Sequence, residues 1–339
     1  MKKVYFLLSI CAVVLSACKN SLEPQNNNFL KDQEVTLGVY MSNNTQAQSS
    51  PRKIDGFVLG NKDENGNYMN NEYGDIAFQW NRGDNIQVVM GTESAFFRML
   101  EDQSSFGDEE DIKVDNTEAY FRGKMPADGD AFKVVYGPAQ VPVKQYYHLD
   151  GIAKNTMRFE SSENCKLGEA IELSPVWCAF RFMLTTTISI PQEISTNREN
   201  YTVNAVMDGL KITAKGEATG TKTYDYVMNK KFESFGESGV SLPVVIVLPP
   251  DEYTEVSVLP VVGSQCVAYQ NSDKSTPKYV GYAGADAATF KFQHKTTGTV
   301  GEQEVEVSVS GATFEGGNYY YSTKVANATI VFKETTSKD

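Results

Sequence analysis

The sequence has little of what enzymes most often use for catalysis. Its 339 residues include two histidines, two tryptophans and five cysteines. His148 and His294 lie far apart and in no paired arrangement, and no GxSxG, GxGxxG or Walker A pattern occurs. We therefore predict that the chain is not an enzyme and that it uses no cofactor.

Basic residues are also scarce. The chain has 31 lysines and arginines against 43 aspartates and glutamates, which gives a formal net charge of −12 at pH 7. Nucleic acid is therefore excluded as a partner, because its phosphate groups would be repelled. The acidic run at residues 108–111 is expected to be a solvated loop, since four consecutive charges in a polar segment favour water.

Long segments rich in alanine, glutamate, lysine and leucine with a helical period are missing. The chain has instead 18 tyrosines and 18 phenylalanines, with frequent valine and threonine, which are residues that strands favour. Apolar segments are short and are separated by clusters of glycine, asparagine and aspartate. The predicted strands are residues 35–41, 57–59, 77–80, 86–90, 119–122, 132–136, 176–184, 201–206, 210–214, 224–228, 244–248, 256–262, 288–292, 305–309, 319–325 and 328–332.

The length indicates two domains, because one domain usually takes about 100–200 residues. Short strands with turn signals between them are typical of β-sandwiches, so the predicted fold is all-β with two tandem β-sandwich domains. A polar stretch at residues 161–169 marks the boundary. The predicted division is 1–17 signal peptide, 18–52 tether and N-terminal strand, 53–168 first sandwich and 169–339 second sandwich.

The first residues have the pattern of a bacterial lipoprotein signal. Lys2 and Lys3 precede an apolar run at 4–15, and Ser16-Ala17 precede Cys18. The apolar run is too short to span a bilayer as a permanent helix. We expect Cys18 to carry acyl chains, which anchor a protein with about 0.8 kcal/mol for each buried CH₂. An ordinary secreted signal with a chance cysteine is the alternative.

The three cysteines of the remaining body lack any metal-ligand spacing. Cys165 and Cys178 could form a disulfide, but an odd number rules out full pairing with Cys266. We interpret all three mainly as small buried residues.

The segment 35–41 alternates apolar and other residues, which predicts a strand with one apolar face. A polar run at 42–50 follows, and then Arg52 and Lys53 form an exposed-looking site suited to proteolysis. A cut after Arg52 would separate the first strand from the rest of the chain. The residues on its apolar face are Val35, Leu37, Val39 and Met41.

One loop has the spacing of a calcium site. Asn61, Asp63, Asn65, Gly66 and Glu72 match positions 1, 3, 5, 6 and 12 of a calcium-binding loop. The loop departs from that pattern because an asparagine stands first and no amphipathic helices flank it. We therefore interpret it as an ordinary hairpin loop and predict no bound metal.

Several short motifs resemble, in their order, the fimbrillin family, the subunits of type V pili of certain Gram-negative anaerobes. The resemblance spans nearly the whole chain after the signal, although each motif is short. The motifs are Cys18, the strand 35–41, Arg52, Trp80-x-x-Gly83-Asp84-x-Ile86, Phe121-Arg122-Gly123, Tyr136-Gly137-Pro138, Trp177-Cys178-Ala179-Phe180-Arg181-Phe182 and Phe314-Glu315-Gly316-Gly317-Asn318-Tyr319-Tyr320.

This resemblance implies two transthyretin-like β-sandwich domains and export to the outer membrane as a lipoprotein with palmitate-type chains on Cys18. It implies that an arginine-specific protease then removes the N-terminal strand and that subunits polymerise by donor-strand exchange into a cell-surface fimbrium. The implied partners are other pilus subunits, the outer membrane before processing, and host or bacterial surface ligands in adhesion. The candidate donor strand carries Ala328, Ile330 and Phe332 on one face, and a resident strand is the alternative.

The sequence leaves other functions open. The chain could be a pilus anchor or tip subunit. It could also be a monomeric surface lipoprotein that binds glycan through exposed aromatics, for which Tyr146, Tyr147, Tyr253 and Tyr282 are candidates.

Overall fold

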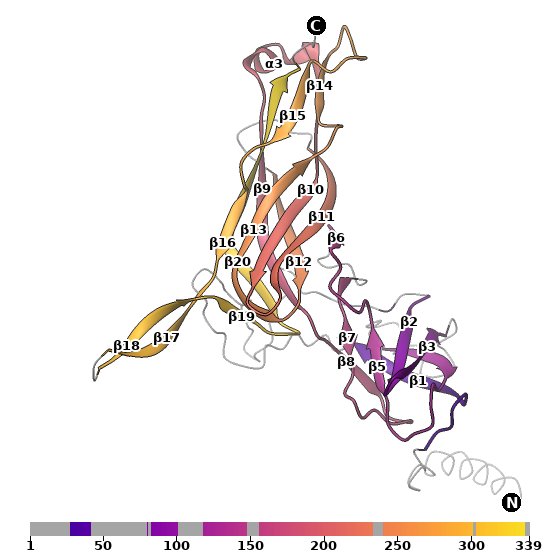
Figure 1. Ribbon diagram of the computed structural model, residues 1–339. Coiled ribbons are helices and arrows are strands. Elements are labelled where there is room, and N and C mark those ends of the chain that lie inside the picture. The colour runs from indigo at the N-terminus through magenta and orange to yellow at the C-terminus, as the bar shows by residue number, and fades with distance from the viewer. Residues whose placement is uncertain are drawn as a thin grey trace, which may run out of the picture.

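A computed structural model describes residues 28–41, 80, 83–100, 118–147, 156–232, 240–300 and 303–335. Strands make up nearly all the regular structure of this part of the chain, which confirms the all-β prediction. Figure 1 shows a long β body, with a smaller group of strands from the N-terminal half beside its lower end. The finer description as tandem transthyretin-like sandwiches stays a prediction.

The strands of the N-terminal half pair in the order β1-β4-β3-β2-β5-β7-β8 and close into a barrel. Alternation explains their burial: in β2, Ile86 and Val88 are fully buried, while Gln87 between them is not. The bounds are β1 Glu34–Met41, β2 Asn85–Met90, β3 Glu93–Met99, β4 Glu118–Lys124, β5 Lys133–Tyr136, β7 Phe159–Glu160 and β8 Ile171–Pro175.

The second sheet has the order β12-β9-β20-β15-β14-β10-β11-β6, and β13 pairs with β10, β16 and β19 beside this path. A short helix, α3 (Gln192–Thr196), and the turn η2 (Arg198–Asn200) follow β9. The bounds are β6 Lys144–Tyr146, β9 Cys178–Ser189, β10 Tyr201–Gly216, β11 Gly220–Phe232, β12 Val240–Leu248, β13 Asp251–Val262, β14 Val267–Gln270, β15 Tyr279–Ala283, β16 Ala288–Lys291, β19 Ala312–Phe314 and β20 Tyr319–Glu334.

Aromatic side chains fill the core of this second sheet. Phe180 of β9 is fully buried and meets Phe290 and Phe292 edge-on, with ring centroids 5.4 and 5.8 Å apart. Such edge-to-face pairs stabilise a core beyond the area that they bury, because the positive edge of one ring meets the negative face of the next. The three native cysteines of the body are free and buried, which confirms their interpretation as small buried residues.

The two halves of the chain share packing at β12. Val244 and Ile246 belong to the core of the second sheet, whereas Val245 and Val247 belong to the core of the N-terminal barrel. Successive residues of a strand point to opposite faces, so β12 serves both cores. β6 already pairs with β11 of the second sheet, and the chain then returns to the barrel with β7 and β8. The last change from the barrel to the second sheet therefore lies between Pro175 and Cys178, after residue 168.

Two strands form a separate hairpin. β17 (Gln293–Val300) and β18 (Gln303–Ser310) pair from Gln293↔Ser310 to Val300↔Gln303. Within the described residues this ribbon is a two-stranded sheet of its own. Figure 1 shows it projecting away from the long body, on the side opposite the barrel.

Candidate functional site

β1 is the strand that joins the two sides of the N-terminal barrel. It pairs antiparallel with β4 from Glu34↔Lys124 to Tyr40↔Glu118, and parallel with β8 from Val39↔Ile171 to Met41↔Leu173. In the described strand order, β4 and β8 are held together through β1. The strand that the sequence singled out as removable therefore lies between two partners.

Two side chains of β1 lie deep in the barrel. Leu37 is 3% exposed and Val39 is fully buried, while Val35 packs against the same core from a partly buried position. Burying a valine or leucine side chain stabilises a fold by about 1.5–3 kcal/mol. Met41 lies within β1, but its side chain is outside the described residues.

The outward side of β1 has few polar contacts among the described residues. Arg122 Nε donates to Thr36 Oγ1 at 3.3 Å, and the Tyr40 hydroxyl donates to Glu172 Oε2 at 3.3 Å. Exposed contacts of this length contribute little stability. Two strand ladders and the inward apolar side chains therefore hold β1 in place.

A polar cleft of about 400 Å³ lies where β1 meets β8. Its lining includes Tyr40 of β1, Glu172 of β8, and Cys165 and Lys166 from the loop before β8. The cleft brings solvent to the end of the short β1–β8 ladder. β1 pairs with β8 only from Val39 to Met41, so this ladder is the shorter of the two that hold it.

Apolar residues of the neighbouring strands form the walls around β1. Ala119 and Phe121 of β4 are fully buried, and Ile171 and Leu173 of β8 are no more than 2% exposed. Without β1, these side chains and the facing backbone groups of β4 and β8 would be exposed to water. A second strand of matching pattern would restore both the burial and the hydrogen bonds.

The predicted donor residues lie in the middle of a sheet. Ala328 and Ile330 are fully buried and Phe332 is 4% exposed. Their strand, β20, pairs parallel with β9 and antiparallel with β15. In this state the segment is a resident strand, the alternative that the sequence left open, and donation by it stays a prediction.

The other predicted site residues fall outside the described part of the chain. These are Cys18, Arg52 and the loop residues Asn61, Asp63, Asn65 and Glu72. Among the described residues, no group of three or more histidine, cysteine, aspartate or glutamate side chains is arranged to hold a metal ion. No helix in the described ranges is long and apolar enough to cross a membrane.

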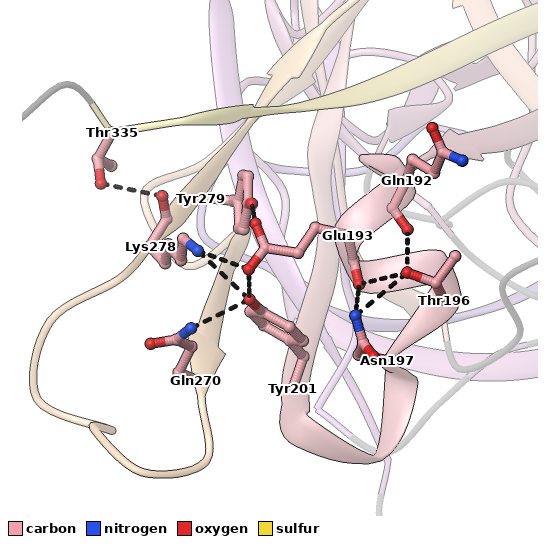
Figure 2. A network of polar contacts seen from close by, with 9 residues as sticks. All are labelled: Gln192, Glu193, Thr196, Asn197, Tyr201, Gln270, Lys278, Tyr279 and Thr335. Atoms are coloured by element: carbon pink, nitrogen blue, oxygen red, sulfur yellow. Dashed lines mark hydrogen bonds and ion pairs between the residues drawn. The ribbon is translucent and has the colours of Figure 1, made fainter.

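A network of polar contacts that the sequence did not indicate lies at the far end of the long body. The Glu193 carboxylate of α3 accepts from Lys278 Nζ at 2.7 Å, from the Tyr279 hydroxyl at 2.6 Å and from the Tyr201 hydroxyl (Figure 2). These donors, Lys278 first, lower the pKa of Glu193 to about 2. Burial of Tyr279, together with its hydrogen bond to Glu193, raises the pKa of the Tyr279 hydroxyl to about 12.

This network fastens the end of β20 as well. Thr335, directly after β20, donates through its backbone N–H to the Lys278 carbonyl at 2.9 Å, and its hydroxyl donates to the Pro277 carbonyl at 2.9 Å. Figure 2 shows Thr335 beside Lys278, with Glu193 reaching Lys278 from the other side. The Glu193 carboxylate, held by three donors of which one is a lysine, therefore fixes α3 to the start of β10 and to the start of β15.

The aromatic residues suggested for glycan binding do not form one surface. Tyr253 is 1% exposed and donates to the Pro249 carbonyl at 2.8 Å, so that candidate was wrong. Tyr146 and Tyr282 are about half exposed, but Tyr146 lies on β6, at one end of the strand order of the second sheet. Tyr282 lies on β15, near the upper end of the long body, and β14, β10 and β11 stand between β15 and β6 in that order (Figure 1). The hydroxyl of Tyr147 is buried and has no hydrogen-bond partner among the residues that the structure describes.

No protein family matches the chain, and neither does any curated protein. Among solved structures, a candidate cell adhesion protein from Bacteroides fragilis is 8% identical over 90% of this chain and 99% of that chain, with a TM-score of 0.33. Another from Bacteroides uniformis is 12% identical over 68% and 92%, with a TM-score of 0.25. The major pilin of Streptococcus pyogenes is 8% identical over 91% and 100%, with a TM-score of 0.18. The proposal below rests on the strand pairing of this chain itself.

Proposed function

We propose that the protein is a structural subunit of a surface filament of the type V pilus kind, which polymerises when β1 is exchanged for a strand of another subunit. The observation that carries this proposal is the position of β1, which is early in the chain and lies between β4 and β8 of a closed barrel. A strand in this place can be removed as one piece, and its removal leaves a gap with defined walls.

Three steps make up the proposed assembly. The chain reaches the outer membrane with lipid on Cys18. An arginine-specific protease then hydrolyses the peptide bond after Arg52, and water supplies the new carboxyl and amino ends. β1 then leaves with the lipidated segment, and a strand from a second subunit enters between β4 and β8. Each subunit accepts one strand and donates one, so the contact is head-to-tail and the assembly is an open filament.

The energetic reason for exchange is the state that removal of β1 leaves behind. The gap exposes Phe121 and Leu173, which are fully buried while β1 is present. The backbone N–H and C=O groups of β4 and β8 that pair with β1 would also lose their hydrogen-bond partners. This loss costs free energy wherever water cannot replace the missing partner. An incoming strand reverses both losses, so polymerisation is favourable without any external energy source.

Limited digestion tests this function. A soluble form of the chain without residues 1–20 is treated with an arginine-specific protease, the new N-terminus is read by mass spectrometry, and the product is run on an unboiled gel. A single cut after Arg52 followed by a ladder of detergent-resistant multimers supports the proposal. The matched control is the double variant Arg52→Gln, Lys53→Gln, in which the adjacent basic residue is also removed. This variant should stay uncut and monomeric.

Other results point to different roles. A cut after Arg52 without multimers would indicate a tip or accessory subunit that needs a different partner. A stable monomer that resists cutting and keeps β1 would contradict the stalk role and favour an anchor subunit or a glycan-binding lipoprotein. The proposed role of the filament in adhesion to host or bacterial surfaces rests on the same proposal.

A further inference from the structure

We infer that the strand entering the gap left by β1 is β18 (Gln303–Ser310) of a second copy of this chain, supplied by the projecting β17–β18 hairpin. This inference rests on the proposed function and names the donor within it. It differs from the prediction that the segment with Ala328, Ile330 and Phe332 donates. Two observations carry it: among the described strands the hairpin pairs only with itself, and the barrel is closed by one strand, β1, whose alternating pattern β18 shares.

The sequences of β1 and β18 match position by position. Residues 34–40 of β1 read Glu-Val-Thr-Leu-Gly-Val-Tyr, and residues 304–310 read Glu-Val-Glu-Val-Ser-Val-Ser. Aligned in this way, valines stand at 305, 307 and 309 where β1 has Val35, Leu37 and Val39. The three valines occupy every second position, as Val35, Leu37 and Val39 do in β1, and this is the spacing of residues that share one face of a strand.

The alignment also places charges opposite one another. In β1, position 34 faces Lys124 of β4 and position 36 faces Arg122. The aligned residues of β18 are Glu304 and Glu306, so each outward cation of β4 would meet a glutamate. In β1 itself only one of these two places is acidic, since Thr36 occupies the other. Opposite charges at facing positions of paired strands are favourable and select the register.

The two candidate donor strands, β20 and β18, differ in the free energy that their release would cost. β20 pairs on both sides, from Tyr319↔Ala179 to Val331↔Ser189 with β9 and from Tyr279↔Glu334 to Ala283↔Ile330 with β15. Its release would break two ladders and empty part of the core. β18 pairs with β17 alone within the described strands. A two-stranded hairpin without a third strand is marginally stable in water, so β18 can exchange β17 for the two edges of the gap at small cost.

A pair of variants tests the inference on the full processed subunit. Val307→Lys places an ammonium group on the apolar face of β18, and Thr296→Lys makes the same change on β17 at the position that pairs with Val307. Both changes lie in the strands of the separate two-stranded sheet. We expect Val307→Lys to lower the yield of detergent-resistant multimers by about tenfold or more, because a charge would have to enter an apolar gap. Thr296→Lys should leave the yield near that of the unchanged subunit.

A charge exchange tests the register. Glu306→Arg alone, or Arg122→Glu alone, should reduce multimer yield, since like charges would face each other in the ladder. The double variant in one chain restores opposite charges at each contact and should recover most of the yield. Recovery in the double variant would show that position 306 of one subunit faces position 122 of the next.

The outcomes separate the two proposals. If the unchanged subunit is cut after Arg52 and forms no multimers, the proposed stalk function fails, and the donor assignment fails with it. If the unchanged subunit and the Val307→Lys variant polymerise equally well, only the assignment of β18 fails.

Discussion

The side-chain amide of Gln145 pairs with the backbone of Val247 as a strand residue would. Its Nε2 donates to the Val247 carbonyl at 2.9 Å, and its Oε1 accepts from the Val247 N–H at 2.9 Å. Gln145 is 2% exposed and lies on β6, at one end of the strand order of the second sheet, whereas Val247 lies on β12, at the other end. One side chain thus joins the two edges of a curved sheet.

Replacing Gln145 should destabilise the fold without changing its apolar core. Gln145→Ala leaves the buried N–H and carbonyl of Val247 without these partners, which we expect to lower the free energy of unfolding by about 1–3 kcal/mol. Lys144→Ala on the same strand, at an exposed position, is the matched control and should change it by less than about 1 kcal/mol. Urea denaturation followed by tryptophan fluorescence measures both. Equal stability of the two variants would contradict the role of Gln145.

The inward side chains of β1 should account for much of the stability of the N-terminal barrel. Leu37→Ala removes a side chain that is 3% exposed, and such changes cost about 2–5 kcal/mol. Glu34→Ala at the exposed start of the same strand should change the unfolding free energy by about 0.5 kcal/mol or less. Denaturation of the uncut subunit compares the two. A small effect of Leu37→Ala would mean that β1 is loosely held before any cleavage.

Locking β1 to β4 should block assembly without blocking cleavage. Tyr40 and Glu118 are register partners in the two strands, and paired strand residues lie within the distance that a disulfide bridges. The double variant Tyr40→Cys, Glu118→Cys should be cut after Arg52 and stay monomeric when oxidised. Addition of a reductant should then start multimer formation. Assembly of the oxidised form would show that β1 need not leave, and either single variant serves as the control.

The Glu193 network predicts a dependence of stability on pH. The pKa of Glu193 in the folded protein, about 2, lies below the ordinary value of 4.5. Its contribution to stability is therefore complete above pH 4.5 and is lost as the pH falls towards 2. Melting temperatures between pH 2 and 7 should show a smaller decline at acidic pH for Glu193→Gln than for the unchanged protein. Parallel curves would show that this carboxylate is not coupled to folding.

Lipidation can be tested separately from assembly. Cells that express the full chain and are labelled with palmitate should incorporate the label into the protein, and Cys18→Ala should abolish it, because the thiol is the predicted acylation site. Cys11→Ala, within the apolar run of the signal, is the matched control and should keep the label. Labelling of the Cys18→Ala variant would contradict the predicted lipoprotein signal.

Local alternation was enough to predict many strands. Residues 35–41 were predicted from their period-2 pattern, and β1 spans Glu34–Met41. Where the pattern is interrupted, the prediction was wrong: residues 201–206 and 210–214 belong to one strand, β10. Its register shifts between Met207 and Gly209, so the Asp-Gly pair marks a bulge instead of a turn. A Cβ at Gly209 would lie 2.0 Å from the Tyr226 carbonyl oxygen, which explains the glycine.

Contacts between distant segments could not be predicted from local patterns. The pairing of Gln145 with Val247 spans about a hundred residues, and a lone glutamine in a polar stretch gives no signal of burial. β17 reads Gln-His-Lys-Thr-Thr-Gly-Thr-Val, which has too few apolar residues to indicate a strand, and its pairing with β18 supplies what its own pattern lacks. The segments 319–325 and 328–332 were predicted as separate strands and form the single strand β20, because Ala326 and Asn327 between them continue the ladder with β9.

The parallel pairing of β20 with β9 sets how the long body would respond to mechanical load. The ladder runs along the strands from Tyr319↔Ala179 to Val331↔Ser189. A force that pulls the two strands apart along their own axes strains all these hydrogen bonds together, whereas a force across them breaks one after another. Tension directed along the long body would therefore meet the stiffer of these two arrangements.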